Sequence, residues 1–297
     1  MIKYISIIGA GTMGNGIAHV FAQHDYVVNL IDVSKEALEK AVGIISKNLD
    51  RQIVKGNINE EQKSLTLKNI STNTSLAAGV AQADLVIEAA TENLALKLSI
   101  FKDIDEAAPA ECILASNTSS ISITKIAAVT RRPEKVIGMH FMNPVPVMKL
   151  VEVINGYSTT QEVSSSISDL AKHIGKVPCV VNDYPGFIAN RILMPMINEA
   201  IYSLHEGVAG VEEIDTVMKL GMAHPMGPLQ LADFIGLDVC QAILQVLLDG
   251  FGNPKYAPCA LLNNMVAAGM LGVKSGEGFY KYTQGSRELV VSKRLTH

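Results

Sequence analysis

The chain has 297 residues, of which 48% are hydrophobic and 18% are charged, and this length allows two domains with separate cores. Its 25 lysines and arginines against 29 aspartates and glutamates give a net charge of -4. That balance excludes an overall basic field of the type that neutralises nucleic-acid phosphates, and we expect no nucleic acid among the partners.

The first residues, MIKYISIIGA, lead directly into a strand-like apolar run and match neither a secretory leader nor an organelle-targeting segment. We therefore expect a cytoplasmic protein. No apolar run reaches the roughly 18 residues that a membrane span needs, so no membrane contact is expected. The four cysteines are widely spaced and have no histidines grouped around them, which predicts reduced thiols and no bound metal.

Short β-branched runs alternate with helical patterns from Tyr4 to about Asn182, and this alternation predicts an α/β fold with a parallel sheet. The runs are YISII, VVNLI, LVIEA, CILAS, VIGMHF, LVEVI and CVVN. Beyond Tyr184 the strand pattern stops, and apolar residues from Ile192 to Leu204 keep the spacing of one helix face. The closing residues, GSRELVVSKRLTH, carry no pattern that predicts an element.

A glycine-rich stretch near the start, SIIGAGTMGNGIA, has the context of a dinucleotide-binding fingerprint, because it follows a strand-like run and opens a helix-like one. Gly9 permits the tight turn, Gly11 lets the backbone approach the cofactor diphosphate, and Gly14 lets helix and strand pack closely. Thr12 and Met13 lie between these glycines and are counted with them as cofactor-binding residues, since the diphosphate is expected at the positive end of the helix.

Asp32 ends the second predicted strand and can accept hydrogen bonds from both hydroxyls of the adenine ribose. Its carboxylate would repel the 2′-phosphate of NADP, so NAD is the expected cofactor. The alternative is that Asp32 caps the following helix, although Ser34 could cap it instead. With the alternating elements, the fingerprint predicts a Rossmann-type NAD-binding domain over residues 1–184 and a smaller all-helical substrate and dimerisation domain over residues 185–297.

Six further motifs follow in order along the chain. They are VIEAATENLALK, ASNTSSISIT, GMHFMNPVPVMKLVEVI, DYPGFIANRILMPMINEA, HPMGPLQLADFIGLD and GVKSGEGFYKY. Together they resemble the 3-hydroxyacyl-CoA dehydrogenase family over nearly the whole chain, from Ile5 to Tyr282. The length is similar to that of the stand-alone 3-hydroxybutyryl-CoA dehydrogenases rather than of the large multifunctional proteins. The resemblance implies reversible, NAD-dependent oxidation of a 3-hydroxyacyl-CoA.

The resemblance implies four catalytic residues, namely His140, Glu152, Ser119 and Asn190. An imidazole titrates near neutrality, so His140 can take the 3-hydroxyl proton in oxidation and return it in reduction. Glu152, on the next predicted strand, can bond the far ring nitrogen and stabilise the imidazolium. Ser119 and Asn190 can hold the reacting oxygen or the thioester carbonyl. Without the resemblance, a structural histidine, a turn-forming serine and a helix-capping asparagine are the alternatives.

The resemblance also implies cofactor contacts by Glu92, Lys97, Ser119, Asn143 and Lys274. Glu92 and Lys97 follow a predicted strand whose carboxyl end should open onto the cofactor crevice. For this pair, a solvated helix start is the alternative.

Four basic residues lie at helical spacing after the second predicted strand, at Lys40, Lys47, Arg51 and Lys55. Coenzyme A is strongly anionic and the chain is net acidic, so a local basic site is needed. We expect Arg51 and Lys55, together with Ser119, to contact coenzyme A. The alternative is an ordinary solvated helix face.

Two other functions stay open on the sequence. One is a dehydrogenase of free β-hydroxy acids, in which a substrate carboxylate replaces the coenzyme A tail. The other is a non-catalytic dinucleotide-binding or structural protein. Whichever function holds, helical second domains of this kind expose apolar faces, and analogy at the level of the fold predicts a homodimer built through residues after 186.

Overall fold

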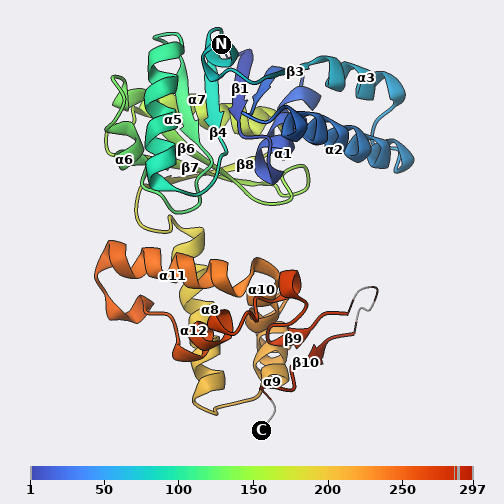
Figure 1. Ribbon diagram of the computed structural model, residues 1–297, viewed down its shortest axis with the longest axis vertical. Coiled ribbons are helices and arrows are strands. Elements are labelled where there is room, and N and C mark those ends of the chain that lie inside the picture. The colour runs from blue at the N-terminus through green and yellow to red at the C-terminus, as the bar shows by residue number, and fades with distance from the viewer. Residues whose placement is uncertain (1, 284, 286–287, 296–297) are drawn as a thin grey trace. The chain divides into compact units, whose positions relative to one another are not determined.

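An eight-stranded sheet organises the N-terminal part of the chain, and helices form most of the remainder (Figure 1). The computed structural model describes residues 2–283, 285 and 288–295. The chain divides into two compact units, one ending at Tyr184 and the other beginning at Pro185. The first unit has the predicted α/β fold. The second is helical except for a small β-ribbon, whereas the prediction was an all-helical domain.

The sheet runs in the order β3-β2-β1-β4-β5-β6-β7-β8. Its strands are β1 (Tyr4–Ile8), β2 (Val27–Ile31), β3 (Ile70–Asn73), β4 (Leu85–Glu88), β5 (Ile113–Ser116), β6 (Val136–Phe141), β7 (Leu150–Asn155) and β8 (Val177–Asn182). The strand order reverses between β1 and β4, and in open α/β sheets ligands bind outside the carboxyl ends of the strands at such a point. The sequence did not predict β3, because its run ISTN is mostly polar.

The sheet departs from the predicted parallel arrangement at one pair. β6 and β7 are antiparallel, and β7 and β8 are parallel, so the last two strands run against the first six. A parallel crossover needs about a dozen residues or more. The connection from β6 to β7, residues 142–149, is shorter and forms turns without a helix, so the chain returns antiparallel.

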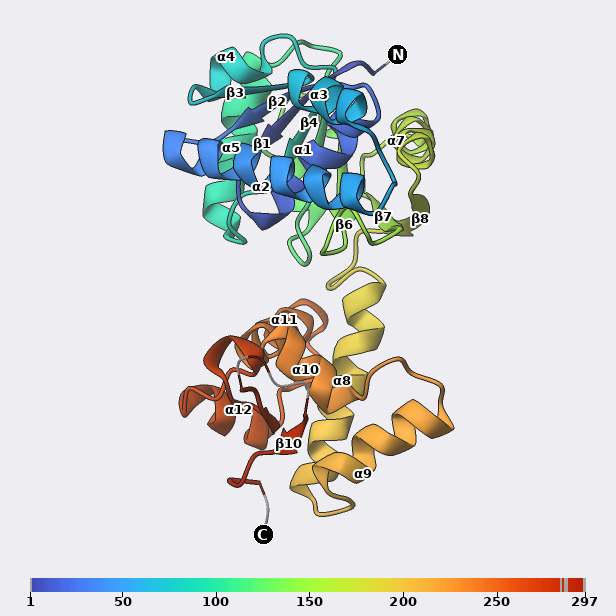
Figure 2. The ribbon, with the colours of Figure 1, turned by 90° about the vertical axis from the view of Figure 1, so that its right-hand side faces the viewer.

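Helices cover both faces of the sheet. In the first unit they are α1 (Thr12–Gln23), α2 (Lys35–Val54), α3 (Glu60–Lys68), α4 (Leu76–Val80), α5 (Leu94–Ala107), α6 (Ile123–Ala127) and α7 (Gln161–His173), with the 3₁₀ turn η1 (Pro133–Lys135). Figure 1 shows α1 and α2 on one face of the sheet and α5 and α6 on the other, and in Figure 2 α1 and α2 lie in front of the strands. Ile5 and Ile7 of β1 share a core with Phe21 of α1, whereas Ser6 between them donates a 2.7 Å hydrogen bond to the carbonyl of Gly79 in α4.

The second unit is a helical cluster with a small β-ribbon. Its elements are α8 (Ala189–His205), α9 (Val211–Thr216), the π-helical η2 (Val217–Gly221), α10 (Pro228–Ile235), α11 (Leu237–Phe251), η3 (Pro254–Tyr256), α12 (Ala260–Ala267), η4 (Val273–Ser275), β9 (Tyr280–Lys281) and β10 (Val290–Val291). Asp233 of α10 accepts hydrogen bonds from the N–H groups of Phe279 and Tyr280, both at 2.9 Å, and so holds the ribbon to the helices. The antiparallel ribbon β9–β10 was not predicted, and β10 lies in the closing residues, to which the sequence assigned no element.

Among the described residues, no single helix is long and apolar enough to cross a membrane. The pair α10 and α11 meets that test only together, with a bend of 97° between the two helices. The described part of the chain also has no group of three or more His, Cys, Asp or Glu side chains that could hold a metal ion. All four cysteines are free thiols, and only Cys179 is exposed.

Candidate active site

The carboxyl ends of five parallel strands meet at one edge of the sheet. β1, β2, β4, β5 and β6 run in the same direction, so the loops that follow them leave from this edge. Because β7 runs the opposite way, its first residues lie at the same edge. Apart from Arg51 and Lys55, the predicted site residues of the first unit belong to these loops, strand ends and helix starts. The topology therefore gathers them along one edge.

Close backbone contacts shape the glycine loop after β1. Gly9 has a φ of +100°, and a Cβ there would lie 2.6 Å from the carbonyl oxygen of Ala89. A Cβ on Gly14 would lie 1.7 Å from the carbonyl oxygen of Gly9, so only glycine lets α1 approach the loop. At Gly11, by contrast, a Cβ would meet nothing within 4 Å. The open space beside Gly11 suits the close approach of a cofactor diphosphate.

The first turn of α1 presents backbone N–H groups without a side-chain cap. α1 begins with Thr12 and Met13, and Gly11 before it supplies no capping side chain. In contrast, the side chains of Ser34 and Asn59 cap α2 and α3. N–H groups and the positive end of the helix dipole favour an anion at such a terminus. Together with the space beside Gly11, this helix start fits the diphosphate of NAD.

Asp32 follows β2 and ties the glycine loop to α2. Its Oδ2 atom accepts a hydrogen bond from the N–H of Ala10 at 2.8 Å, and its Oδ1 atom accepts one from the N–H of Ser34 at 3.0 Å. Ser34 caps α2, because its hydroxyl accepts from the N–H of Ala37 at 3.1 Å. The structure thus gives the capping role to Ser34. An ionised carboxylate has about four acceptor sites, so Asp32 retains sites for ribose hydroxyls.

His140 and Glu152 lie directly opposite each other in the antiparallel register of β6 and β7. The Nδ1 atom of His140 is 2.7 Å from the Oε2 atom of Glu152, which is the hydrogen bond expected from the sequence. The Glu152 side chain is 1% exposed and that of His140 is 12% exposed, so water screens this interaction only weakly. In the neutral ring the bond to Glu152 places the proton on Nδ1 and assigns proton exchange with a ligand to Nε2.

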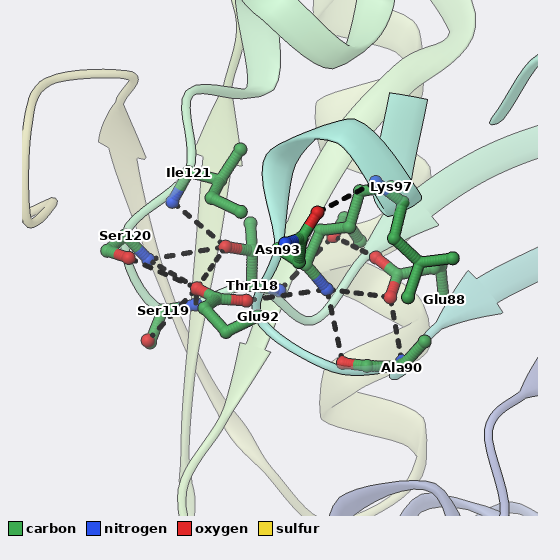
Figure 3. Close-up of polar contacts among 11 residues, drawn as sticks. Glu88, Ala90, Glu92, Asn93, Lys97, Thr118, Ser119, Ser120 and Ile121 are labelled. Carbon is green, nitrogen blue, oxygen red and sulfur yellow. Dashed lines mark hydrogen bonds and ion pairs between the residues drawn. The ribbon is translucent and has the colours of Figure 1, made fainter. Parts of the chain in front are cut away.

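One carboxylate oxygen of Glu92 anchors the turn after β5 (Figure 3). This atom, Oε1, accepts from the Thr118 hydroxyl at 2.5 Å, from the N–H groups of Ser119 and Ser120 at 3.0 and 3.2 Å, and from their hydroxyls at 3.2 and 3.1 Å. Burial of the Glu92 carboxyl raises its pKa, but these hydrogen bonds and the charge of Lys97 outweigh that effect. The pKa of Glu92 therefore lies below its ordinary value, and an ionised carboxylate holds the Ser119 turn.

A buried ion pair adjoins Glu92. The Nζ atom of Lys97 is 2.7 Å from Oε1 of Glu88 and 3.4 Å from Oε2 of Glu92, and the Lys97 and Glu88 side chains are 1% and 0% exposed. Glu88 also accepts hydrogen bonds from the Ser116 hydroxyl at 2.6 Å and the Ala90 N–H at 2.7 Å. The ammonium of Lys97 thus lies between two carboxylates, and a direct contact of Lys97 with the cofactor stays a prediction.

The connection from β6 to β7 carries Asn143, which is exposed and precedes Pro144 through a cis peptide bond. Further along this connection, the carbonyls of Val145 and Met148 accept hydrogen bonds from the ammonium of Lys176 at 2.5 and 2.8 Å. Lys176 is buried, and burial lowers its pKa. This lysine, which precedes β8, therefore fastens the connection that leaves the His140 strand.

A cavity of about 790 Å³ is lined by residues of α1, α2, α3 and the connection from β6 to β7. Arg51 in the last turn of α2 and Lys55 directly after this helix both line it. Val147 of the connection from β6 to β7 also lines it. Of the four basic residues singled out in the sequence, Lys40 and Lys47 are not among the described residues that line this cavity. Of the basic residues considered for coenzyme A, Arg51 and Lys55 are thus the two that line the cavity.

Comparisons with known proteins match both units. A family model for the NAD-binding domain of 3-hydroxyacyl-CoA dehydrogenase matches residues 4–184, and one for the C-terminal domain matches residues 186–282. The chain belongs to the 3-hydroxyacyl-CoA dehydrogenase family. It is an NAD-dependent oxidoreductase, which agrees with the glycine loop, the uncapped start of α1 and the carboxylate of Asp32.

Relatives of the dehydrogenase match it over nearly their whole length. A probable 3-hydroxybutyryl-CoA dehydrogenase of Bacillus subtilis is 54% identical over 95% of this chain and 98% of that protein. A 3-hydroxybutyryl-CoA dehydrogenase of Bradyrhizobium diazoefficiens is 51% identical over 95% and 96% of the two chains. The crystal structure of (S)-3-hydroxybutyryl-CoA dehydrogenase from Ralstonia eutropha is similar with a TM-score of 0.93 at 51% identity, and the match covers 96% of this chain and 100% of that one.

Two predicted site residues of the dehydrogenase lie in the second unit. Asn190 is in the first turn of α8, where its N–H donates to the carbonyl of Gly186 at 3.2 Å. Gly186 has a φ of +73°, and a Cβ there would lie 2.6 Å from a methyl group of Leu247. Lys274 lies in η4 and forms an ion pair with Asp238 at the start of α11. The cofactor and substrate contacts predicted for these two residues stay predictions.

Several residues that organise this edge were not predicted from the sequence. Glu88, Ser116 and Lys176 are buried polar side chains, and each fixes a loop or a charged neighbour. Asn117 accepts a 2.9 Å hydrogen bond from the N–H of Phe141, the residue after the histidine. One signal was available for Glu88, since an acidic residue closes the otherwise apolar run LVIE. Lys176 had no comparable local signal.

Proposed function

We propose that this dehydrogenase interconverts 3-hydroxybutyryl-CoA and acetoacetyl-CoA with NAD, and that it prefers short acyl chains. The observation that carries the proposal is the 2.7 Å hydrogen bond between His140 and Glu152, at the sheet edge that also bears the glycine loop. The names of relatives that are 51% and 54% identical support the choice of substrate.

His140 is the proposed acid and base. In oxidation its Nε2 atom takes the proton of the 3-hydroxyl group, and in reduction it returns a proton to the same oxygen. Glu152 accepts the Nδ1–H bond throughout, which keeps the ring oriented and stabilises the positive charge that the ring acquires. NAD, when bound, accepts the hydride from C3 in oxidation and supplies it as NADH in reduction.

Ser119 and Asn190 are the proposed polar contacts of the substrate. The Glu92 carboxylate orients the Ser119 backbone and hydroxyl by two hydrogen bonds. A fixed hydroxyl holds a reacting oxygen at a lower entropic cost than a mobile one. Asn190 offers an amide that can donate to the substrate or accept from it.

The cavity beside α2 is the proposed site for the anionic end of coenzyme A. Its volume of about 790 Å³ lies in the range of small-molecule sites, and Arg51 and Lys55 supply positive charge at its wall. An ordinary solvated helix face would not need such a concavity. The cavity therefore supports these two residues over the other basic residues of the same helix.

The second unit is the proposed dimerisation surface. It exposes several large apolar side chains, among them Ile192, Val208, Val217 and Leu220. Val208 and Val217 also line a mainly apolar groove of about 440 Å³. Apolar surface that is grouped in this way favours a protein contact. Light scattering should give the mass of two chains at micromolar concentration, and Val217→Asp should shift the measured mass toward that of one chain. A single-chain mass for the wild type would contradict the proposal.

The cytoplasmic location is also proposed, and cell fractionation would test it.

The rates of NADH oxidation with acetoacetyl-CoA and with acetoacetate test the proposed activity. We expect the thioester to react with a kcat/KM at least about a hundredfold higher, since the free acid lacks the binding energy of the coenzyme A tail. The reverse preference would indicate a dehydrogenase of free β-hydroxy acids. His140→Gln should lower kcat by about a hundredfold or more while NADH still binds. NADH binding without turnover of either compound would indicate a non-catalytic dinucleotide-binding protein.

A further inference from the structure

Glu88 connects three segments at the carboxyl edge of the sheet. It is the last residue of β4 and is fully buried. Its Oε1 atom accepts from the N–H of Ala90 and from the ammonium of Lys97, both at 2.7 Å. Its Oε2 atom accepts from the hydroxyl of Ser116, the last residue of β5, at 2.6 Å. One carboxylate thus joins the loop after β4, the first turn of α5 and the end of β5 (Figure 3).

One side of this cluster supports the glycine loop. The N–H of Ala89 donates to the carbonyl of Ile8 at 2.7 Å, and the carbonyl of Ala89 is the atom that a Cβ on Gly9 would meet at 2.6 Å. The hydrogen bond from Ala90 to Glu88 fixes the peptide directly after this contact. Glu88 therefore holds the backbone against which the cofactor loop packs.

The other side supports the Ser119 turn. Lys97 lies between Glu88 and Glu92, and it is closer to Glu88, at 2.7 Å against 3.4 Å. The other oxygen of Glu92 takes its hydrogen bonds from Thr118, Ser119 and Ser120. Without the charge of Glu88, Glu92 would be the remaining carboxylate within 4 Å of the ammonium. It would then be drawn toward Lys97 and away from the turn.

We propose that Glu88 is a positioning residue of the dehydrogenase, which keeps Lys97 in place so that Glu92 holds the Ser119 turn in register with the glycine loop. The proposal rests on the proposed function, because Ser119 is assigned to the substrate there. Stability alone is a weak reason for the pair, since well-packed apolar residues often replace a buried ion pair without loss. The other residues of β4 are apolar, and its one charged residue, Glu88, is at the end of the strand that borders the site.

Glu88→Gln tests the proposal, because glutamine keeps the shape of the side chain and removes its charge. Asp105→Asn is the matched control. Asp105 is a buried carboxylate of the same helix as Lys97, it is paired with Arg131 and Arg132, and it belongs to none of the site loops. For each variant the readouts are kcat and KM with acetoacetyl-CoA, the dissociation constant of NADH from its fluorescence, and the melting temperature. All kinetics are measured well below the melting temperature.

We expect Glu88→Gln to lower kcat/KM by about tenfold or more and to raise the dissociation constant of NADH about threefold, since small displacements of positioning groups are costly. Asp105→Asn should lower the melting temperature and leave both constants within about twofold of the wild type, because a purely structural pair does not change the folded enzyme's kinetics. A kcat/KM for Glu88→Gln no lower than that of the control would overturn the proposal.

Ser116→Ala decides the question if Glu88→Gln does not fold. It removes one hydrogen bond to Glu88 without changing a charge, and a fall in kcat/KM of about threefold is expected. An unchanged kcat/KM in Ser116→Ala would then overturn the proposal. If the wild type does not turn over acetoacetyl-CoA, the proposed function is wrong. The affinity of the variants for NADH then still tests whether Glu88 positions the glycine loop.

Discussion

The charge of Glu152 should be needed for proton transfer at His140, and Glu152→Gln isolates that charge. Glutamine can still accept the Nδ1–H bond, so the ring keeps its orientation and its tautomer. A hydrogen bond to a charged partner contributes about 1.5–3 kcal/mol. Because the Glu152 side chain is 1% exposed and lies 2.7 Å from the ring, solvent does not replace the lost charge. At 1.36 kcal/mol for each factor of ten, kcat should fall roughly 10- to 150-fold.

The assay is the oxidation of NADH by acetoacetyl-CoA, followed by absorbance, with kcat and KM determined separately. The dissociation constant of NADH should change by less than about twofold, because the pair lies on β6 and β7, whereas the diphosphate loop follows β1. The melting temperature should change little, since the substitution removes a charge that is costly to bury and keeps an acceptor for the Nδ1–H bond. A further check is the double variant with His140→Gln, which should be no slower than His140→Gln alone.

Two results would refute this account of Glu152. A kcat within about threefold of the wild type would show that the carboxylate charge is not needed when the imidazolium forms. A parallel loss of NADH affinity would show that the substitution disturbs the cofactor loop instead. An additional loss in the double variant would mean that Glu152 acts on turnover by a route other than His140.

The remaining predictions concern the cofactor loop, the cavity and acid stability. Gly11→Ala should leave the melting temperature unchanged and weaken NADH binding about tenfold or more, because its Cβ enters open space that the diphosphate approaches. Gly14→Ala should instead destabilise the fold by about 3 kcal/mol, since its Cβ would overlap the Gly9 carbonyl oxygen. An unchanged melting temperature would contradict this prediction. Arg51→Gln should raise the KM for acetoacetyl-CoA about two- to fivefold at low salt, whereas Lys47→Gln, on the same helix but outside the cavity, should not. Burial lowers the pKa of His19 from 6.5 to about 4, so between these values the unfolded chain binds a proton that the folded chain does not. The free energy of unfolding should therefore fall as the pH drops from 6.5 to 4, by about 3 kcal/mol at most, and His19→Gln should flatten this slope in thermal unfolding measured across pH.

The features that the sequence predicts well depend on short-range constraints. Gly9 and Gly14 are five residues apart, in the loop after β1 and the first turn of α1, so the glycine spacing alone predicts their close contact. Most strands of the sheet are apolar runs that are buried on both faces, which makes them visible as runs. The pairing of His140 with Glu152 was expected from the family resemblance, and the two residues lie on consecutive strands with one short connection.

The features that it does not predict depend on distant partners. β3 is an edge strand with a mostly polar run, and its pairing with β2, as of Ile70 with Val28, defines it. Lys176 is fixed by carbonyls of the connection before β7, and no local pattern announces that contact. Glu88 is an acid at the end of an apolar strand. Its hydrogen bond to Ser116 depends on the pairing of β4 with β5, so the sequence alone does not predict it. Such buried polar groups are satisfied by tertiary structure, which a single sequence does not show.

The antiparallel return of β7, which the sequence did not predict, is what brings the acid–base pair together. A parallel neighbour of β6 would begin at the opposite edge of the sheet after a long crossover, so Glu152 would not face His140 across a short connection. In the observed register, Val151 and Val153 pack into the core that contains Phe21 of α1, and Glu152 between them points to the other face, toward His140. A slip of one residue would bury the carboxylate among apolar side chains and expose both valines to the wrong face. The packing of residues with no chemical role therefore fixes the position of Glu152, and a substitution that changes the register of β7 would disable His140 without touching it.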